Sequence, residues 1–171
     1  EMVGTPTSDY PDLFERMLAH EASCTELFFM TLTSVRSSFA TPLPREDLYT
    51  LARKLTSAVE ELTSAAHILY LHRIATHSTA ILDIIQRQAV LTEAVIPKLI
   101  DVRGLDTYWM DMLRISRQAV RTAEEYDAQL AARYPMERYR RYTKFITRLS
   151  AAANAMRDVS AEIGRIIVQE S

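Results

Sequence analysis

The scarcity of chain breakers constrains the fold of this sequence more than any other feature. Only three glycines and six prolines occur in 171 residues, and four of the prolines lie at positions 6, 11, 42 and 44. The long stretches between the breakers are rich in alanine, leucine, arginine and glutamate, which are good helix formers. No segment shows the alternation of apolar and polar residues that is typical of a strand.

Apolar residues recur at steps of three, four and seven, which is the spacing of one helix face. Five segments show this pattern, from about residue 11 to 39, from 44 to 75, from 78 to 97, from 105 to 134, and from 135 almost to the end. Between the third and fourth segments, the residues at 102–104 are the clearest stop signal. Long helices joined by short breaks favour antiparallel neighbours. The sequence therefore predicts an all-α fold, an elongated antiparallel bundle of about five long helices.

The pattern also predicts the domain organisation. Residues 1–10 read as a flexible N-terminal tail, and residues 11–171 as one helical bundle domain. Ser8 or Asp9 is expected to cap the first helix. The apolar stripe of that helix is expected to run as far as Phe39, and that of the fourth helix to include Trp109 and Val120.

The net charge and the cysteine content limit the compartments and the partners that suit this chain. A net charge of −2 argues against nucleic acid or an anionic membrane as the partner of the whole chain. The single cysteine, Cys24, excludes an internal disulfide and fits a reducing compartment. No stretch approaches the roughly 20 apolar residues that span a bilayer, and the first residues lack a signal pattern. We expect a cytoplasmic protein that meets a membrane only through a partner.

The motifs that would indicate catalysis are absent. Three scattered glycines cannot form a phosphate loop, and no Glu-x-x-His pair occurs. His20 and Cys24 share a helix face, but a free cysteine is more often buried and inert. His67, His72 and His77 are five residues apart, whereas metal-binding histidines on a helix need spacings of three or four. We expect no enzymatic activity and no cofactor.

Two basic clusters stand out on the fourth and fifth helices. The first consists of Arg114, Arg117 and Arg121, and the second is centred on Arg138, Arg140 and Arg141. One interpretation is docking to an acidic partner, a phosphate group or a membrane surface. The other is a solvated face balanced by nearby glutamates. Both interpretations remain open from the residues alone.

Asp127 lies on an apolar stripe, seven residues after Val120 and three before Leu130. A carboxylate that faces a core is costly unless it is paired. We expect it either to meet an arginine or lysine across the bundle, which is the favoured interpretation, or to bind a ligand.

Residues 39–52, FATPLPREDLYTLA, resemble a signature of the PhoU-like family, in the group often called Pit accessory proteins. There a long helix ends in a Phe-x-Thr-Pro turn, and an Arg-Glu-Asp-Ile/Leu-Tyr helix start follows. The likeness continues across most of the chain as helix lengths and order. The resemblance implies a non-enzymatic, cytoplasmic regulator of inorganic phosphate transport, which acts by contact with a transporter or its signalling partners.

The metal-binding residues of that family are mostly absent from this sequence. Its members hold clustered metal ions with acidic residues four apart on several helices, and eight such positions align here. Only Glu60 and Asp127 among the eight keep a carboxylate, so no pair is whole. A hard cation wants about six oxygen ligands, and we therefore predict no multinuclear metal cluster.

These observations predict a partner surface and leave one alternative function open. The surface is predicted at the basic clusters and at the turn before the second helix, with the residues Arg45, Arg114, Arg117, Arg121, Arg138, Arg140 and Arg141. Glu46 and Asp47, next to Arg45, are also explained by helix capping alone. The alternative function is a self-assembling bundle unrelated to phosphate, and in either case we expect a homo-oligomer.

Overall fold

The computed structural model describes residues 2, 4–75, 78–101 and 105–169 of the chain. The predicted stop at 102–104 and the candidate residue His77 lie outside these residues. The described chain forms α-helices and two short 3-10 helices and contains no strand. The α-helices are α1 (Tyr10–Ser37), α2 (Arg45–His72), α3 (Ala80–Val95), α4 (Asp106–Arg133) and α5 (Met136–Gln169), and the 3-10 helices are η1 (Thr7–Asp9) and η2 (Ile96–Lys98). The predicted all-α fold is confirmed.

The helix boundaries follow the breakers, with two differences in detail. Helix α3 has only 16 residues, because Pro97 cannot continue an α-helix and the chain tightens into η2 there. Asp9 occupies the N-cap of α1 but makes no capping bond, and instead accepts a hydrogen bond of 2.8 Å from the Ser8 hydroxyl. Pro11 lies in the first turn of α1, where its missing backbone N–H leaves no helix hydrogen bond unmade.

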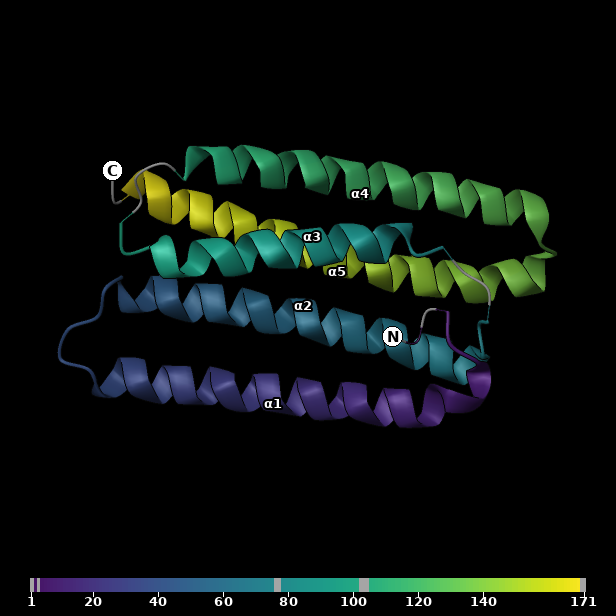
Figure 1. The fold of residues 1–171 in the computed structure, drawn as a ribbon, viewed down its shortest axis with the longest axis horizontal. Coiled ribbons are helices and arrows are strands. Elements are labelled where there is room, and N and C mark those ends of the chain that lie inside the picture. The colour runs from purple at the N-terminus through teal and green to yellow at the C-terminus, as the bar shows by residue number, and fades with distance from the viewer. Residues whose placement is uncertain (1, 3, 76–77, 102–104, 170–171) are drawn as a thin grey trace.

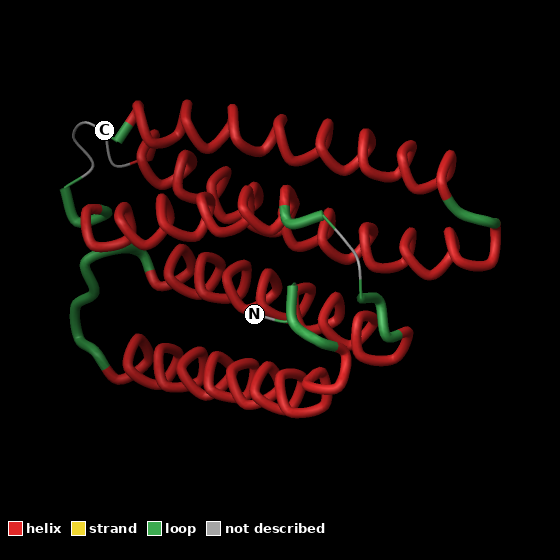
Figure 2. Tube along the Cα trace, turned by 45° about the vertical axis from the view of Figure 1, so that its right-hand side comes forward, coloured by secondary structure: helices red, strands yellow, loops and turns green. Residues whose placement is uncertain are grey.

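The helices form an elongated bundle in which the chain reverses direction at each connection (Figure 1). Helix α1 packs on α2, and α2 packs on α5. Helices α3 and α4 pack on each other and on α5. Helix α1 is therefore the outer helix at one side of the bundle, and the rotated view shows the same order (Figure 2).

The core follows one face of α5 along nearly its whole length. In one half of the bundle, Phe145 and Leu149 pack with Ile81 and Ile84 of α3 and with the end of α2. In the other half, Ile163 and Ile166 pack with Met112 of α4 and with Leu51 of α2. Each fully buried aliphatic side chain contributes about 1.5–3 kcal/mol, so this face of α5 holds the bundle together.

Three residues expected on the apolar stripes are more exposed to solvent than predicted. Phe39 follows the end of α1 and is fully exposed, and Val120 and Trp109 on α4 are partly exposed. The Trp109 ring instead lies over α5, where a Cβ atom on Gly164 would come within 2.9 Å of its Nε1 atom. Glycine is thus the residue that lets this ring approach the α5 backbone.

The N-terminal segment, residues 1–10, contacts the bundle at two of its described residues. The Met2 side chain is buried in the core cluster, and Tyr10 is 1% exposed. The Tyr10 hydroxyl donates a hydrogen bond of 2.8 Å to the carbonyl oxygen of Ile74, beyond the end of α2. This bond ties the start of α1 to the end of α2.

A buried polar cluster connects α3, α4 and α5 in the middle of the core. Gln88 is 0% exposed, and its Nε2 donates hydrogen bonds of 3.2 Å to the Ser116 hydroxyl and to the carbonyl oxygen of Ala153. The hydroxyls of Thr92 and Tyr108 lie 3.3 Å apart nearby. Burial raises the pKa of the Tyr108 phenol, so this group stays neutral. Gln88 therefore joins three helices through its amide.

We predict that Gln88→Ala lowers the free energy of unfolding by about 3 kcal/mol, because it opens a cavity and removes donors from two buried acceptors. Gln86→Ala, at an exposed position of the same helix, is the control and should change stability by less than about 0.5 kcal/mol. Urea unfolding followed by circular dichroism measures both. Equal losses for the two variants would contradict the structural role of Gln88.

Candidate functional site

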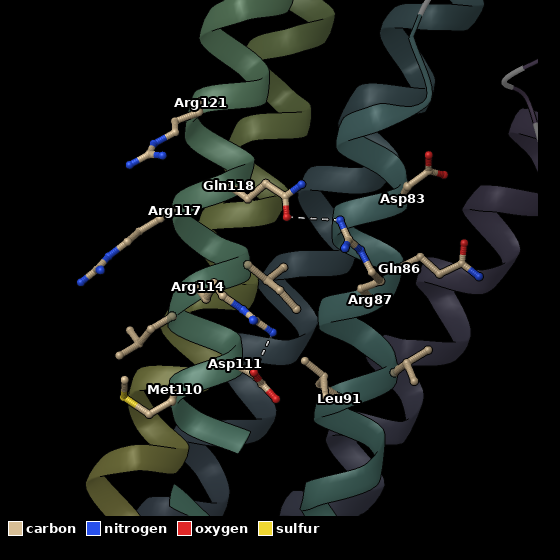
Figure 3. A pocket seen from close by; sticks show the side chains of 13 residues that line it. Asp83, Gln86, Arg87, Leu91, Met110, Asp111, Arg114, Arg117, Gln118 and Arg121 are labelled. Carbon is tan, nitrogen blue, oxygen red and sulfur yellow. Dashed lines mark hydrogen bonds and ion pairs between the residues drawn. The ribbon is translucent and has the colours of Figure 1, made fainter. Parts of the chain in front are cut away.

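An open groove of about 1360 Å³ runs between α3 and α4 (Figure 3). Its α3 wall includes Asp83, Arg87 and Val90, which follow one another at steps of four and three and so share a helix face. Its α4 wall follows the same rule over a longer stretch, with the residues Met110, Asp111, Arg114, Arg117, Gln118 and Arg121. The helical period alone therefore places the lining residues of each wall on one face of its helix.

The groove carries more basic than acidic groups. Four arginines line it against two aspartates, Asp83 and Asp111. Arg114 pairs with Asp111 at 2.9 Å, an exposed bond of low strength. Within the described residues, neither Arg117 nor Arg121 has an ion-pair partner, and both extend from α4 on the side away from α3 in Figure 3. These two guanidinium groups are available to a partner.

Apolar side chains lie among these charges. Val90 on α3 and Met110 on α4 are each more than half exposed, and Leu91 is half-buried beside them. Arg87 reaches across from α3, and its Nη2 donates a hydrogen bond of 3.4 Å to Gln118 Oε1 on α4. The lining of the groove thus mixes apolar and basic side chains, which suits an amphipathic partner surface.

A second basic pocket, of about 400 Å³, lies at the end of the bundle where α2 ends and α5 begins. His72 and Arg73 come from the end of α2, and Arg138 and Arg141 come from the first turns of α5. The Arg138 guanidinium carbon lies 4.4 Å from the centre of the Tyr134 ring, which orients it by a cation–π contact. We name this site the end pocket.

The charges of the end pocket act on His72. Burial lowers the pKa of the His72 imidazole below its ordinary value of 6.5, and the positive charges of Lys144 and Arg141 lower it further. A histidine at the C-terminal end of a helix is normally favoured in its charged form by the helix dipole. Burial and the neighbouring cations therefore outweigh the dipole at this position.

The basic residues predicted as one partner surface occupy separate places. Arg114, Arg117 and Arg121 lie together at the groove, and Arg138 and Arg141 lie at the end pocket. Arg140 is exposed on α5. Arg45 is at the opposite end of the bundle, where its Nη2 donates a hydrogen bond of 2.7 Å to the carbonyl oxygen of Ser38 and bridges the α1–α2 connection.

The two retained acidic residues, Glu60 and Asp127, have partners of their own. Glu60 pairs with Arg53 at 3.2 Å on α2. Asp127 accepts hydrogen bonds from the Tyr139 hydroxyl at 2.9 Å and the Thr143 hydroxyl at 3.4 Å. The partners of Asp127 are thus hydroxyls of α5, and not the arginine or lysine that we predicted. Among the described residues, no three His, Cys, Asp or Glu side chains come together in a way that could hold a metal ion.

One ionic network was missed by the sequence analysis. Asp47 is only 4% exposed, and its Oδ1 accepts a hydrogen bond of 2.5 Å from Arg165, which also bonds Glu162. These hydrogen bonds, with Asp47 the larger cause, raise the pKa of the Arg165 guanidinium. Lys54 pairs with Glu162 at 3.5 Å. Asp47 thus links α2 to α5 and does more than cap its own helix. The sequence feature that could have indicated this network is Glu162, an acidic residue adjacent to Ile163 on the apolar stripe of α5.

Comparison with known proteins adds no family to this picture. No protein-family model matches the chain, and no curated protein matches it. Among the described residues, no helix has both the length and the apolar character needed to cross a membrane.

We predict that acidification destabilises the chain partly through His72. Because the folded state lowers the pKa of His72, the unfolded chain binds the proton more readily below the ordinary pKa of 6.5, and stability falls as the pH drops through that region. The variant His72→Gln should therefore lose less stability than the wild type between about pH 7.5 and about pH 5.5 in urea unfolding. His20→Gln on α1 is the control with which the pH dependence of His72→Gln is compared. An unchanged difference in His72→Gln would refute the assignment.

Proposed function

We propose that this protein is a non-enzymatic, PhoU-like accessory protein of inorganic phosphate transport, which acts by contact with another protein. The observation that carries the contact is the groove between α3 and α4, whose lining includes exposed apolar side chains and four arginines. The link to phosphate transport is supported by the resemblance of residues 39–52 to the PhoU-like signature. We propose a cytoplasmic location for the protein, as the same resemblance implies.

The chemistry of the groove favours an acidic amphipathic helix as the partner segment. Exposed Val90 and Met110 offer apolar contacts, and four arginines outnumber two aspartates around them. Arginine forms paired hydrogen bonds with carboxylates in a planar geometry that lysine does not match. Because Arg117 and Arg121 have no ion-pair partner within the described residues, an acidic helix gains their charges without breaking an internal pair.

The α1–α2 turn has a structural role in this proposal. The Arg45 guanidinium holds the carbonyl oxygen of Ser38, and Asp47 is bonded to Arg165. Both side chains are thus engaged within the chain. The groove, and not this turn, is the partner surface that we propose.

Uptake of radiolabelled phosphate in the host tests the proposal. Deleting the gene should change the uptake rate, and the wild-type copy should restore it. The variant Arg117→Glu/Arg121→Glu should fail to restore uptake, because it reverses two exposed charges at the outer edge of the α4 wall (Figure 3) that have no ion-pair partner within the described residues. The matched control Arg36→Glu/Arg157→Glu makes the same charge change at exposed positions outside the groove and should restore uptake.

Two results would count against the proposal. Unchanged uptake after deletion, with the protein demonstrably expressed, removes the link to phosphate transport. Equal failure of the groove variant and its control shows that net charge matters and the groove does not.

A second candidate function, self-assembly, is favoured by the outer face of α1. Leu27, Phe29 and Met30 are each about 60% exposed. Residues 27–35 contain no charged residue, so two copies can pair there without like-charge repulsion. Such a contact between the same patch of two subunits is the commonest arrangement in homodimers.

If α1 mediates self-assembly, the wild type should form a dimer or larger species in size-exclusion chromatography with light scattering. Leu27→Gln/Met30→Gln should convert it to a monomer, since it replaces two exposed apolar side chains without changing charge. A wild type that is monomeric at every concentration would exclude this function.

A further inference from the structure

The end pocket brings together cationic groups that are distant in the sequence. Arg73 closes α2, and Arg138 and Arg141 belong to the first turns of α5. Glu137 is the one acidic residue among those that line the pocket in the described chain. Three arginines therefore surround about 400 Å³ of open space with a single opposing carboxylate.

His72 lines the same space beside these arginines. Burial lowers the pKa of its imidazole, and the charges of Lys144 and Arg141 on α5 lower it further. An anion bound in the pocket would neutralise that charge. Glu137 is the acidic side chain that faces the same space from α5.

The backbone at Arg73 fixes where its side chain leaves α2. Arg73 ends α2 in the left-handed conformation, with φ 46° and ψ 51°. Its backbone N–H and that of Ile74 bond back to carbonyl oxygens of the last turn, which is a common ending of an α-helix. Arg73 at this helix end lines the pocket.

We propose that the end pocket binds a phosphate dianion, either free in solution or carried by a lipid headgroup. Arg138 and Arg141 supply the paired hydrogen bonds that phosphate oxygens accept, and Arg73 supplies a third charge from the facing helix. Glu137 and Arg138 of the first turn of α5 line the same wall, so the positive end of that helix dipole lies close to the pocket. This inference stands on the pocket alone and does not depend on the proposed role in phosphate transport.

Glu137 makes the proposal testable by a gain of affinity. Its Oε1 lies 2.7 Å from Arg141 Nη2, and the Glu137 side chain is 85% exposed. Surface pairs of this kind are weak, so an incoming phosphate displaces the carboxylate. Removing the carboxylate should leave Arg141 free for the ligand.

The experiment titrates the purified full chain with inorganic phosphate by calorimetry. Arg138→Gln/Arg141→Gln should weaken binding by roughly tenfold or more, and Glu137→Gln should tighten it by roughly threefold. Arg36→Gln/Arg157→Gln, with the same loss of charge at distant exposed positions, should bind as the wild type does. Thermal unfolding verifies that each variant is folded.

Nuclear magnetic resonance of the His72 imidazole provides a second readout, with the signal assigned by His72→Gln. Saturating phosphate should raise the pKa of His72, because the dianion opposes the positive charge of Lys144 and Arg141. This shift is measured in the wild type, so it does not depend on whether the arginine variants are correctly folded.

Vesicles of phosphatidylcholine with and without phosphatidic acid distinguish the two sources. Calorimetric binding of inorganic phosphate assigns the free anion. Binding only to vesicles that contain phosphatidic acid, lost in Arg138→Gln/Arg141→Gln, assigns a lipid phosphate. The proposal is overturned if neither probe binds, or if the distant control pair weakens binding as much as the pocket pair. Because these assays use purified protein, their failure is separate from a failure of the uptake experiment.

Discussion

The arrangement of the bundle depends on burial of one face of α5 along almost the entire helix. Phe145 and Leu149 fill one half of the core, and Val159, Ile163 and Ile166 fill the other. Helices α2, α3 and α4 each pack on this face, and α1 joins the bundle mainly through α2. Because most of the stability of a helix in a protein comes from packing of its apolar face and not from propensity, tertiary burial is what keeps the bundle folded.

Polar interactions then set how the helices are placed along that face. Gln88 ties α3 to α4 and α5 inside the core. Arg165 holds the buried carboxylate of Asp47 and fixes the start of α2 against the end of α5. A buried carboxylate without its cation is strongly destabilising, so this pair restricts sliding of the two helices. The rigid frame that results presents the groove and the end pocket in fixed positions.

The two basic sites differ in the kind of ligand they suit. The groove is long and mixes arginines with exposed Val90 and Met110, which matches a protein segment. The end pocket is small, and three arginines dominate its charge, which matches a compact anion. One site lies along the side of the bundle and the other at its end, so the partner and the anion that we propose would contact different residues.

The sequence by itself determined the helices and their faces. Apolar residues at steps of three and four locate each helix, and prolines such as Pro97 and Pro135 mark where helices stop, because both effects are local. The spacing of Arg114, Arg117 and Arg121 on one helix face is likewise a local property. Gln88, seven residues after Ile81 on an apolar stripe, could also have been assigned to the core from the sequence.

Only the tertiary structure decided which residues from different helices meet. Asp47 and Arg165 are 118 positions apart, and their pairing depends on how α2 packs on α5. The same packing brings His72 and Arg73 to Arg138 and Arg141, and it separates Arg45 from the other predicted arginines. Helical periodicity sets the direction of each side chain about its own axis, whereas the packing of apolar faces sets which axes become neighbours. The first is local in the chain and the second is not.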